Sequence, residues 1–405
     1  MTELLLDEFV PSDPPAGAFS STVAPPSATA AAFSGFHEFE FTGNGAEYFR
    51  IWVVNLLLTV ATLGIYSAWA KVRRLEYFWR NTRFDGAIFD YHGEPKAILK
   101  GRLLAFGLFA AYKLAFDISA LLAVGIGVLL VVILPWLLAR SFRFRLASTS
   151  YRGVRFHFSG TVAEAYRSLI LLPVILLLTG LFVWSVFVSY HSHPSILVML
   201  LVTVLPAMAI FSVIPMAHFL LKRYQHDHAY FGQSPFFFQG QPKAFFKVYG
   251  KAIGLLVFGM FAAGLFGGLT FGLSSALASS SFGWLFNFLF ATLSGYILFL
   301  FVRPYLESRI QNMVWNKTEL GDYRFVSTAR ARSLLWIHAS NLLLIICTTG
   351  LYKPFAAIRL VRYRLACLSL QGGQTLDEVL ANRTPDSSGA AGQEAADFFD
   401  IEIAL

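Results

Sequence analysis

The chain has 405 residues, of which 56% are hydrophobic and only 14% are charged, and its formal net charge is +8. A soluble domain has about a quarter charged residues, so this composition excludes a water-soluble globular protein. Several apolar runs are about 20 residues long, the length that crosses a bilayer core as a helix. The sequence therefore predicts an all-α polytopic membrane protein with about eight transmembrane or re-entrant helices.

Both ends of the chain are predicted to be disordered. Residues 1–35 are rich in Pro, Ala and Ser and have no Lys or Arg ahead of their apolar part, which argues against a secretory signal. Residues 374–405 form an acidic tail rich in Ala and Gly. The membrane domain is therefore expected over residues 36–373.

Six apolar spans are predicted between these ends. They fall near residues 101–120, 122–139, 166–189, 196–221, 248–273 and 284–304. The short connectors between paired spans have no Lys or Arg, whereas the long connectors are basic. The positive-inside rule therefore places the long connectors in the cytoplasm. Because this topology accounts for the positive charge, we expect the lipid bilayer, and no nucleic acid, as a partner.

An aromatic-x-aromatic-x-Gly motif recurs in the long connectors and before the first apolar segment. Its residues are Phe39, Phe41, Gly43, Phe89, Tyr91, Gly93, Phe156, Phe158, Gly160, Phe236, Phe238 and Gly240, and a fifth copy, "YRFVS" at 323–327, has Ser in the last place. Alternating aromatics beside an Asp-Gly or Arg-Gly step are typical of β-hairpins, in which Gly supplies the positive φ of the turn. The predicted repeat is a short cytoplasmic β-hairpin followed by a helical hairpin. Its units are expected near 36–74, 75–141, 142–221, 222–308 and 309–373.

One apolar segment occurs twice. "NLLLTVATLGIYSAWAKVRR" (55–74) returns as "NLLLIICTTGLYKPFAAIRL" (341–360). Residues 46–66 and 332–352 are each just long enough to span, and the lack of Lys and Arg in the preceding arm favours spanning. Re-entry, with breaks at Gly64 and Gly350, is favoured because the aromatic motif stands on both sides of the first segment. In either case we expect the two copies to pack against each other and close the bundle.

The first copy of this segment resembles the YjgN-type bacterial inner-membrane family. The matching positions are Phe39, Phe41, Gly43, Tyr48, Phe49, Asn55, Leu57, Leu58, Thr62, Leu63, Gly64, Ile65, Tyr66, Trp69, Ala70, Asn81 and Gly86. The resemblance extends over about residues 36–370. It implies a multi-span protein of the bacterial cytoplasmic (inner) membrane, and it implies no activity because the family's shared domain has no established one.

Polar and glycine residues within the apolar segments are the candidate functional positions. Lys113 and Asp117 stand at i and i+4, which predicts an ion pair on one helix or, alternatively, part of a polar path. The candidates in the duplicated segment are Asn55, Gly64, Tyr66, Asn341, Gly350 and Tyr352. Five glycines at four-residue spacing predict close helix packing: Gly250, Gly254, Gly264, Gly268 and Gly272.

Metal and cofactor sites are not predicted. The histidine pairs in "HSH" (191–193) and "HDH" (226–228) lack the further ligands that a metal site needs. His218 and His338 are expected to be satisfied interior residues, and Cys347 and Cys367 small core residues. Because the nucleotide-binding and hydrolase motifs are missing, no cofactor is expected and an enzyme is the less favoured class.

Two functional hypotheses follow. Internal repeats and paired helix breaks favour a transporter or channel for a small solute, an ion or a lipid. Sparse intramembrane charge favours the alternative, a non-transport assembly or envelope factor that binds a protein partner through its cytoplasmic β-hairpin loops.

Overall fold

A computed structural model describes residues 35–192, 195–275 and 281–372. The acidic segment 374–405 and nearly all of the N-terminal arm lie outside these ranges, as does His193 of the "HSH" pair.

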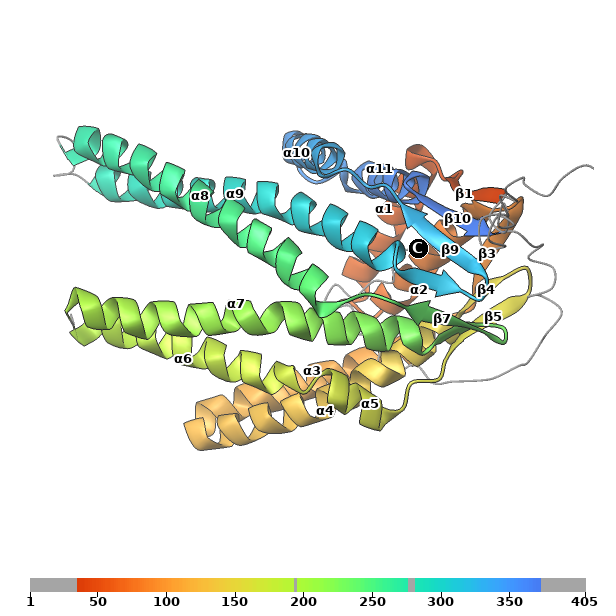
Figure 1. Ribbon diagram of the computed structural model, residues 1–405, viewed down its shortest axis with the longest axis horizontal. Coiled ribbons are helices and arrows are strands. Elements are labelled where there is room, and N and C mark those ends of the chain that lie inside the picture. Colours follow the sequence, from red (N-terminus) through yellow and green to blue (C-terminus); the bar gives the residue numbers. More distant parts are fainter. Residues whose placement is uncertain (1–34, 193–194, 276–280, 373–405) are drawn as a thin grey trace, which may run out of the picture.

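Five copies of one strand–helical hairpin–strand unit make up the described chain (Figure 1). The first is β1 (Gly35–Phe41), α1 (Gly45–Ala61), α2 (Ser67–Arg80) and β2 (Thr82–Phe84). The second is β3 (Ala87–Tyr91), α3 (Pro95–Ile118), α4 (Ala120–Ala147) and β4 (Thr149–Tyr151). The third is β5 (Val154–Phe158), α5 (Val162–Ser168), α6 (Leu171–Ser192), α7 (Ile196–Asp227) and β6 (Ala229–Phe231). The fourth is β7 (Ser234–Phe238), α8 (Pro242–Ser275), α9 (Ser281–Trp315) and β8 (Thr318–Leu320), and the fifth is β9 (Tyr323–Ser327), α10 (Ala331–Cys347), α11 (Lys353–Ala366) and β10 (Leu368–Gly372).

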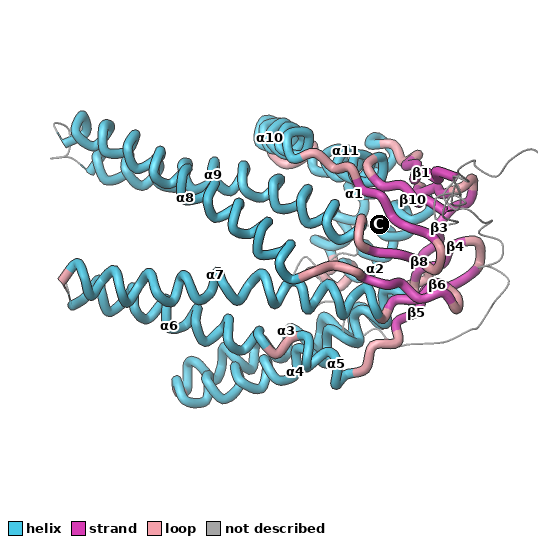
Figure 2. The backbone as a smooth tube through the Cα atoms, viewed as in Figure 1, coloured by secondary structure: helices cyan, strands magenta, loops and turns pink. Residues whose placement is uncertain are grey.

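The strands of all five units join in one closed antiparallel barrel, which corrects the all-α prediction. Each described strand pairs with its neighbour in the chain, and β1 closes the ring on β10, with Gly35 opposite Gly372. Figure 2 shows the strands gathered at one end of the molecule, with the helical hairpins extending away from them. The prediction of separate hairpins failed because the two strands of each unit also pair with each other, which links the turn-joined hairpins into one ring. Both ends of every helical hairpin are consequently fixed to the barrel.

Two-residue turns join the units. Asp85 and Gly86 have φ of 45° and 72°, and Arg152 and Gly153 have φ of 48° and 78°. Successive positive φ values at two central residues are typical of the type I′ turn that suits a twisted hairpin. The predicted Asp-Gly and Arg-Gly turns are confirmed by this geometry.

The first aromatic residue of the motif fills the barrel. Phe39 stacks on Phe84 with ring centroids 4.5 Å apart, and Phe156 lies 4.8 Å from Phe231. These rings belong to one buried cluster that also includes Phe325. Because small barrels are filled by inward-pointing side chains, the alternating aromatics supply the core that the short strands need.

The motif glycine makes room for the second aromatic ring. A Cβ added to Gly43 would lie 2.6 Å from the Phe41 ring, and one added to Gly160 would lie 2.5 Å from the Phe158 ring. The ring two residues earlier therefore folds over the glycine, which needs no positive φ here. In the fifth unit Ser327 lies opposite Leu368, the first residue of β10. In the second unit the residue opposite Thr149, the first residue of β4, is Tyr91, so Ser327 holds the position of the second aromatic residue. The assignment of "YRFVS" was thus wrong by two residues, and Ala329 occupies the glycine position.

Tyrosine hydroxyls tie the two helices of a unit together in three copies. The Tyr77 hydroxyl donates to the Asn44 carbonyl and accepts from the Asn44 amide, both at 2.9 Å. Tyr363 makes the same pair of bonds with Arg330, at 3.3 Å and 2.8 Å. Burial raises the pKa of Tyr77 to about 12, so its hydroxyl keeps the proton that it donates.

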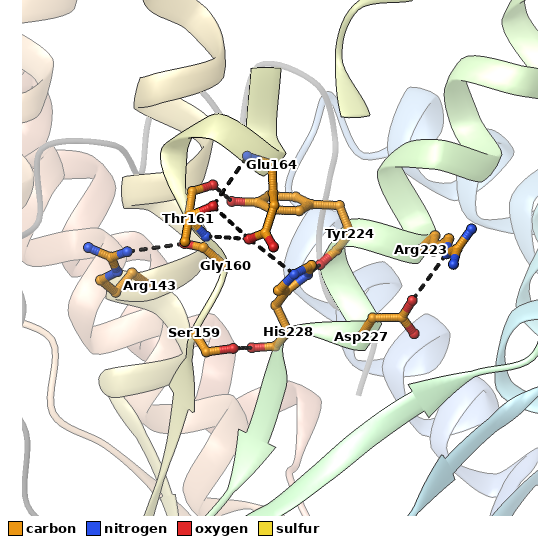
Figure 3. Close-up of polar contacts among 9 residues, drawn as sticks. All are labelled: Arg143, Ser159, Gly160, Thr161, Glu164, Arg223, Tyr224, Asp227 and His228. Atoms are coloured by element: carbon orange, nitrogen blue, oxygen red, sulfur yellow. Dashed lines mark hydrogen bonds and ion pairs between the residues drawn. The ribbon is translucent and has the colours of Figure 1, made fainter. Parts of the chain in front are cut away.

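The third tyrosine belongs to a wider network (Figure 3). Tyr224 donates to the Thr161 carbonyl at 3.1 Å, and Thr161 and Glu164 form a reciprocal capping box at the start of α5. Glu164 also lies 3.2 Å from His228, while Arg143 of α4 donates to the Gly160 carbonyl at 3.1 Å. His228 of the "HDH" stretch therefore joins the end of α7 to α5 within the third unit, as expected for an interface histidine.

The hairpins differ in length. Five helical stretches are long and apolar enough to cross a membrane: Ala120–Ala147, Val162–Val188, Val204–Asp227, Pro242–Gly268 and Phe288–Trp315. They coincide with five of the six predicted spans. The sixth prediction falls in α3, whose charged residues include Arg102, Lys113 and Asp117. Outward-facing side chains such as Leu121 and Phe258 are exposed, as contact with lipid requires.

The duplicated segment forms two short hairpins with the same break. Leu63 and Gly64 have φ of 50° and 93°, and Thr349 and Gly350 have φ of 49° and 96°. The Gly64 amide donates to the Thr59 carbonyl at 2.8 Å, which is a Schellman-type helix end. Because β1 and β2 pair with each other, the chain returns to the side from which it entered. The spanning interpretation of residues 46–66 is therefore wrong, and the same geometry makes 332–352 re-entrant.

Glycines other than the predicted ones lie at the contact between α8 and α9. A Cβ on Gly267 would meet Phe290, and Gly259 lies against Leu298. Gly250, Gly254, Gly264 and Gly268 have open space beside them instead. The four-residue spacing predicted the wrong face, because a small-residue stripe can equally well face lipid.

Replacing Gly160 by Ala tests the close ring contact. The added methyl group must displace Phe158 and the Tyr224 hydroxyl, and overpacking of this kind costs about 1–3 kcal/mol. We expect a lower unfolding temperature in detergent, measured by intrinsic fluorescence. Gly264→Ala, which has open space and a helical backbone, should unfold no lower than the unchanged protein. An unchanged midpoint for Gly160→Ala would contradict the stated role of the motif glycine.

Replacing Tyr77 by Phe tests the tyrosine bonds. The change removes a donor and an acceptor for Asn44 without altering ring packing, so we expect a loss of about 1 kcal/mol in unfolding free energy. Urea or thermal denaturation of the purified protein measures it. Tyr230→Phe is the matched control, since no hydrogen bond of its hydroxyl is found among the described residues. Equal midpoints for the two variants would show that the Tyr77 hydroxyl adds nothing to stability.

Candidate functional site: a basic cavity between the first and last hairpins

A cavity of about 860 Å³ lies where the first and last hairpins meet. Its walls come from α1, α2 and α11, with α3 and α4 contributing one side and Phe156 of the barrel contributing to the floor. Phe49 of α1 lies 5.7 Å from Phe355 of α11, measured between ring centroids. Arg362 of α11 donates to the Gly43 carbonyl at 2.8 Å. The expectation that the two copies pack against each other is confirmed by these contacts.

The charged side chains that line the cavity are all basic among the described residues. There are six of them: Lys71 and Arg74 from α2, Arg102 from α3, Arg145 from α4, and Lys353 and Arg364 from α11. No Asp or Glu of the described chain is part of the lining. A cleft lined by one sign of charge between low-dielectric walls raises the local concentration of the opposite charge. The cavity is therefore suited to an anion.

Apolar side chains form the rest of the wall. Trp52 and Leu56 of α1 face Leu360 and Val361 of α11 across it, and Trp79 of α2 lies nearby. A cavity with both basic groups and large apolar surfaces suits a ligand that has an acidic end and an apolar body.

Arg364 is held by a carboxylate outside the lining. Glu307 of α9 accepts hydrogen bonds from Arg364 Nη2 at 3.2 Å, from Arg303 Nε at 2.7 Å and from His338 Nε2 at 3.0 Å. His338 is thus a satisfied interior residue, as predicted, and so is His218, which bonds the Tyr249 hydroxyl at 2.8 Å. This cluster ties α9, α10 and α11 together and fixes the cationic wall of the cavity.

The two equivalent asparagines differ in their surroundings. Both are 7% exposed. Asn341 donates from Nδ2 to the Ala356 carbonyl at 3.4 Å, and its Oδ1 accepts from Arg359 at 3.4 Å. Asn55 lines the cavity, and its buried Oδ1 has no hydrogen-bond partner. Of the pair that the sequence singled out, only Asn55 belongs to the site.

The other candidate positions of the break, Gly64, Tyr66, Gly350 and Tyr352, lie outside the described cavity lining. Ser67 donates to the Gly64 carbonyl and accepts from Arg102, which joins the first and second units. Tyr66 stacks on Trp69 at 6.2 Å, and Tyr352 stacks on Phe355 at 5.6 Å. Neither tyrosine is part of the described lining.

Lys113 and Asp117 form the predicted ion pair, at 3.7 Å on α3. Their side chains are 64% and 63% exposed and lie outside the cavity lining. Exposed pairs of this type contribute little to stability.

The histidines and cysteines form no site in the described residues. No group of three or more His, Cys, Asp or Glu there could hold a metal ion. His226 is buried against Trp315, and His191 bonds the Phe187 carbonyl at 2.9 Å. Both cysteines are free thiols, and Cys347 is exposed, so its assignment to the core was wrong.

Most of the cavity cations were missed by sequence reasoning. The basic run from Lys71 to Arg83 is typical of an amphipathic helix at the membrane surface and by itself does not indicate a cavity. Lys71 and Arg74 stand three residues apart on one helix face, which was the one available signal. Arg102, Arg145 and Arg364 come from other units, and no local pattern connects them.

Comparison with known proteins identifies the family of this chain. A family model described as "Bacterial protein of unknown function (DUF898)" matches residues 36–398. The chain is 32% identical over 145 residues to the "Inner membrane protein YjgN" of Salmonella typhimurium (strain LT2), covering 35% of this chain and 36% of that protein. It is 30% identical over 171 residues to the protein of the same name in Escherichia coli (strain K12), covering 40% of this chain and 42% of that protein.

The matched part thus spans less than half the length of these relatives. No solved structure matches the chain. Together with the five apolar helical stretches, the family match over most of the chain leads to one conclusion: the chain belongs to the DUF898 family and is a multi-pass protein of the bacterial inner membrane, in contact with the lipid bilayer.

Proposed function

We propose that this protein is a transport protein for an anionic amphiphile, and that the basic cavity holds the acidic headgroup of its substrate. The observation that carries the proposal is the set of six basic side chains, with no acid among the described lining residues, set between apolar walls. The proposal narrows the transporter hypothesis from solutes in general to lipid-like acids.

Electrostatics favours an acidic occupant. Two like charges about 8 Å apart at an effective dielectric of about 20 repel by about 2 kcal/mol. A phosphate or carboxylate between them replaces that repulsion with charge-assisted hydrogen bonds, for which the arginine guanidinium groups are well suited. Binding of an anion therefore stabilises the cavity as well as the ligand.

The position of the cavity favours an amphiphile over a small free ion. It lies beside two re-entrant hairpins that are shorter than the membrane-crossing helices, and broken helices of this kind line substrate sites in transporters. A volume of about 860 Å³ accommodates a headgroup and the first part of an acyl chain. The rest of the chain would remain in the bilayer.

The alternative, an assembly factor that binds its partner through the β-hairpin loops, has less support. Each described strand is paired on both sides, so the barrel offers no free edge to which a partner strand could add. A partner would have to contact the outward-facing side chains of the strands, such as Ile88 and Phe237, or the two-residue turns. An enzyme is a third class, for which the described site has no metal-ligand cluster.

Replacing Arg74 by Gln tests the proposal. We expect the affinity of the delipidated protein for dioleoyl phosphatidylglycerol to fall about tenfold, because one charge-assisted bond of about 1.5 kcal/mol is lost. Native mass spectrometry with lipid titration measures it. Arg73→Gln is the matched control, since Arg73 is exposed on the same helix and outside the described lining. It should change the affinity less than twofold.

Three outcomes would contradict the proposal. One is an equal affinity of the unchanged protein for phosphatidylglycerol and phosphatidylcholine. Another is an equal effect of Arg73→Gln and Arg74→Gln. The third is lipid binding that appears only in a chain ending at Gly372, which would make the acidic segment 374–405 the occupant of the cavity.

Transport itself is tested in vesicles. Purified protein in liposomes should speed the movement of labelled phosphatidylglycerol between leaflets, measured by chemical quenching from outside. The Arg74→Gln variant should slow this movement while the Arg73→Gln variant does not. Binding without movement in the unchanged protein would restrict the function to lipid binding.

A further inference from the structure

Asn55 has an unsatisfied carbonyl oxygen at the wall of the cavity. The residue is 7% exposed, and its Oδ1 is buried without a hydrogen-bond partner. A buried acceptor without a donor costs about 1–3 kcal/mol, and such groups are rare in folded proteins. Asn55 is one of the residues that line the cavity, so a ligand bound there is the source from which a donor would come.

The equivalent residue in the last hairpin has a hydrogen-bonded oxygen, so the unpaired oxygen of Asn55 does not follow from the repeated hairpin alone. Asn341 stands at the same position of a helix with the same break, and its Oδ1 accepts from Arg359. Arg73 occupies the position of Arg359 in the first copy, but it is exposed and lies outside the described cavity lining. The two copies therefore differ in whether this asparagine oxygen accepts a hydrogen bond, and only the copy without one lines the described cavity.

The described lining of the cavity has one side-chain amide oxygen, that of Asn55. Its six basic residues are donors only. Its four Ser and Thr hydroxyls each donate to a backbone carbonyl: Thr59 to Asn55, Ser67 to Gly64, Thr82 to Phe78 and Thr149 to Arg145. Those hydroxyl oxygens keep lone pairs that can also accept, whereas Asn55 Oδ1 is a buried amide oxygen without a donor. A ligand that only accepts hydrogen bonds would leave it unpaired.

We propose that the cavity selects an anionic headgroup that also carries a hydroxyl, and that Asn55 Oδ1 accepts the hydrogen bond of that hydroxyl. The chemistry is that of a hydroxylated phosphodiester, which occurs in lipids such as phosphatidylglycerol and in free glycerol or sugar phosphodiesters. This inference rests on the proposed function, since it names the substrate class of the same cavity. The basic residues hold the phosphate, and Asn55 distinguishes one headgroup from another.

Two lipids separate the hydroxyl from the charge. Phosphatidylglycerol and phosphatidylmethanol with the same acyl chains each carry one phosphodiester charge, but only the first has headgroup hydroxyls. We expect the unchanged full-length protein to bind phosphatidylglycerol about fivefold more tightly, as one neutral hydrogen bond implies. Native mass spectrometry with both lipids in competition measures the ratio.

Asn55→Leu should bring this ratio to about one and leave the affinity for phosphatidylmethanol unchanged. Asn341→Leu is the matched control, and it should keep the ratio of the unchanged protein even if it lowers stability. Because the readout is a ratio of two ligands on one protein, a partly unfolded variant does not imitate the result.

Soluble glycerophosphoglycerol distinguishes the two sources of the headgroup. Competition with phosphatidylglycerol at comparable concentration would assign the site to free phosphodiesters, and its failure to compete would assign it to the lipid.

The inference and the proposed function fail in different ways. Equal binding of both lipids by the unchanged protein, abolished by Arg74→Gln, would overturn the role of Asn55 and leave the anion site intact. Loss of the ratio in Asn341→Leu as well as Asn55→Leu would also overturn it. Binding of neither lipid would overturn the proposed function itself.

Discussion

The hydrogen-bonded ladder between β1 and β10 joins the two ends of the described chain, with Phe36 opposite Gln371 and Glu38 opposite Ser369. This pairing leaves no strand edge, which in an open sheet would be a site of unwanted association. It also makes the first and last helical hairpins neighbours, although they are the most distant in sequence. The cavity exists because of this closure, since its opposite walls belong to α1 and α11.

The barrel also explains why a short hairpin can enter the membrane. A hairpin whose two ends are fixed at paired strands must return, whatever its length. Helix α1 has 17 residues and α2 has 14, whereas α8 and α9 have 34 and 35. A 17-residue helix is about 26 Å long, so its turn ends within a bilayer about 30 Å thick. Non-helical backbone at that depth must have its polar groups satisfied, and here the Gly64 amide donates to the Thr59 carbonyl at 2.8 Å while the Ser67 hydroxyl donates to the Gly64 carbonyl.

Part of the fold could be predicted from the sequence because it is governed by local patterns. Long apolar runs identified the crossing helices, and the alternation at Phe89 and Tyr91 identified a strand. The register of the last motif was assigned wrongly because Tyr323 and Phe325 fit the aromatic alternation, whereas the true positions are Phe325 and Ser327 and serine replaces the second ring. Closure of the barrel was not predictable in this way, since it depends on strands from the two ends of the chain meeting in register.

The candidate site was predictable to a smaller extent. Asn55 and Asn341 were singled out together, and no neighbouring residue in the sequence separates the one that lines the cavity from the one that does not. The distinction depends on whether Arg359 or its counterpart Arg73 turns toward the asparagine, and that is settled by the packing of neighbouring helices. The cations Arg102 and Arg145 come from a different unit, so only the assembled barrel brings them to Lys71 and Arg74.

A repeated architecture confines chemical specificity to the places where the copies differ. Five equivalent units around a barrel would present five equivalent surfaces, and such a molecule has no unique site. Here the tyrosine that bonds the residue before the first helix is found in three of the five described units. The asparagine oxygen of the short hairpins accepts a hydrogen bond in the last unit and has no donor in the first. The shared motifs, such as the ring folded over Gly43 or Gly160, hold the strands and helices in place. The departures from the repeat, above all at Asn55, are where a ligand can be recognised.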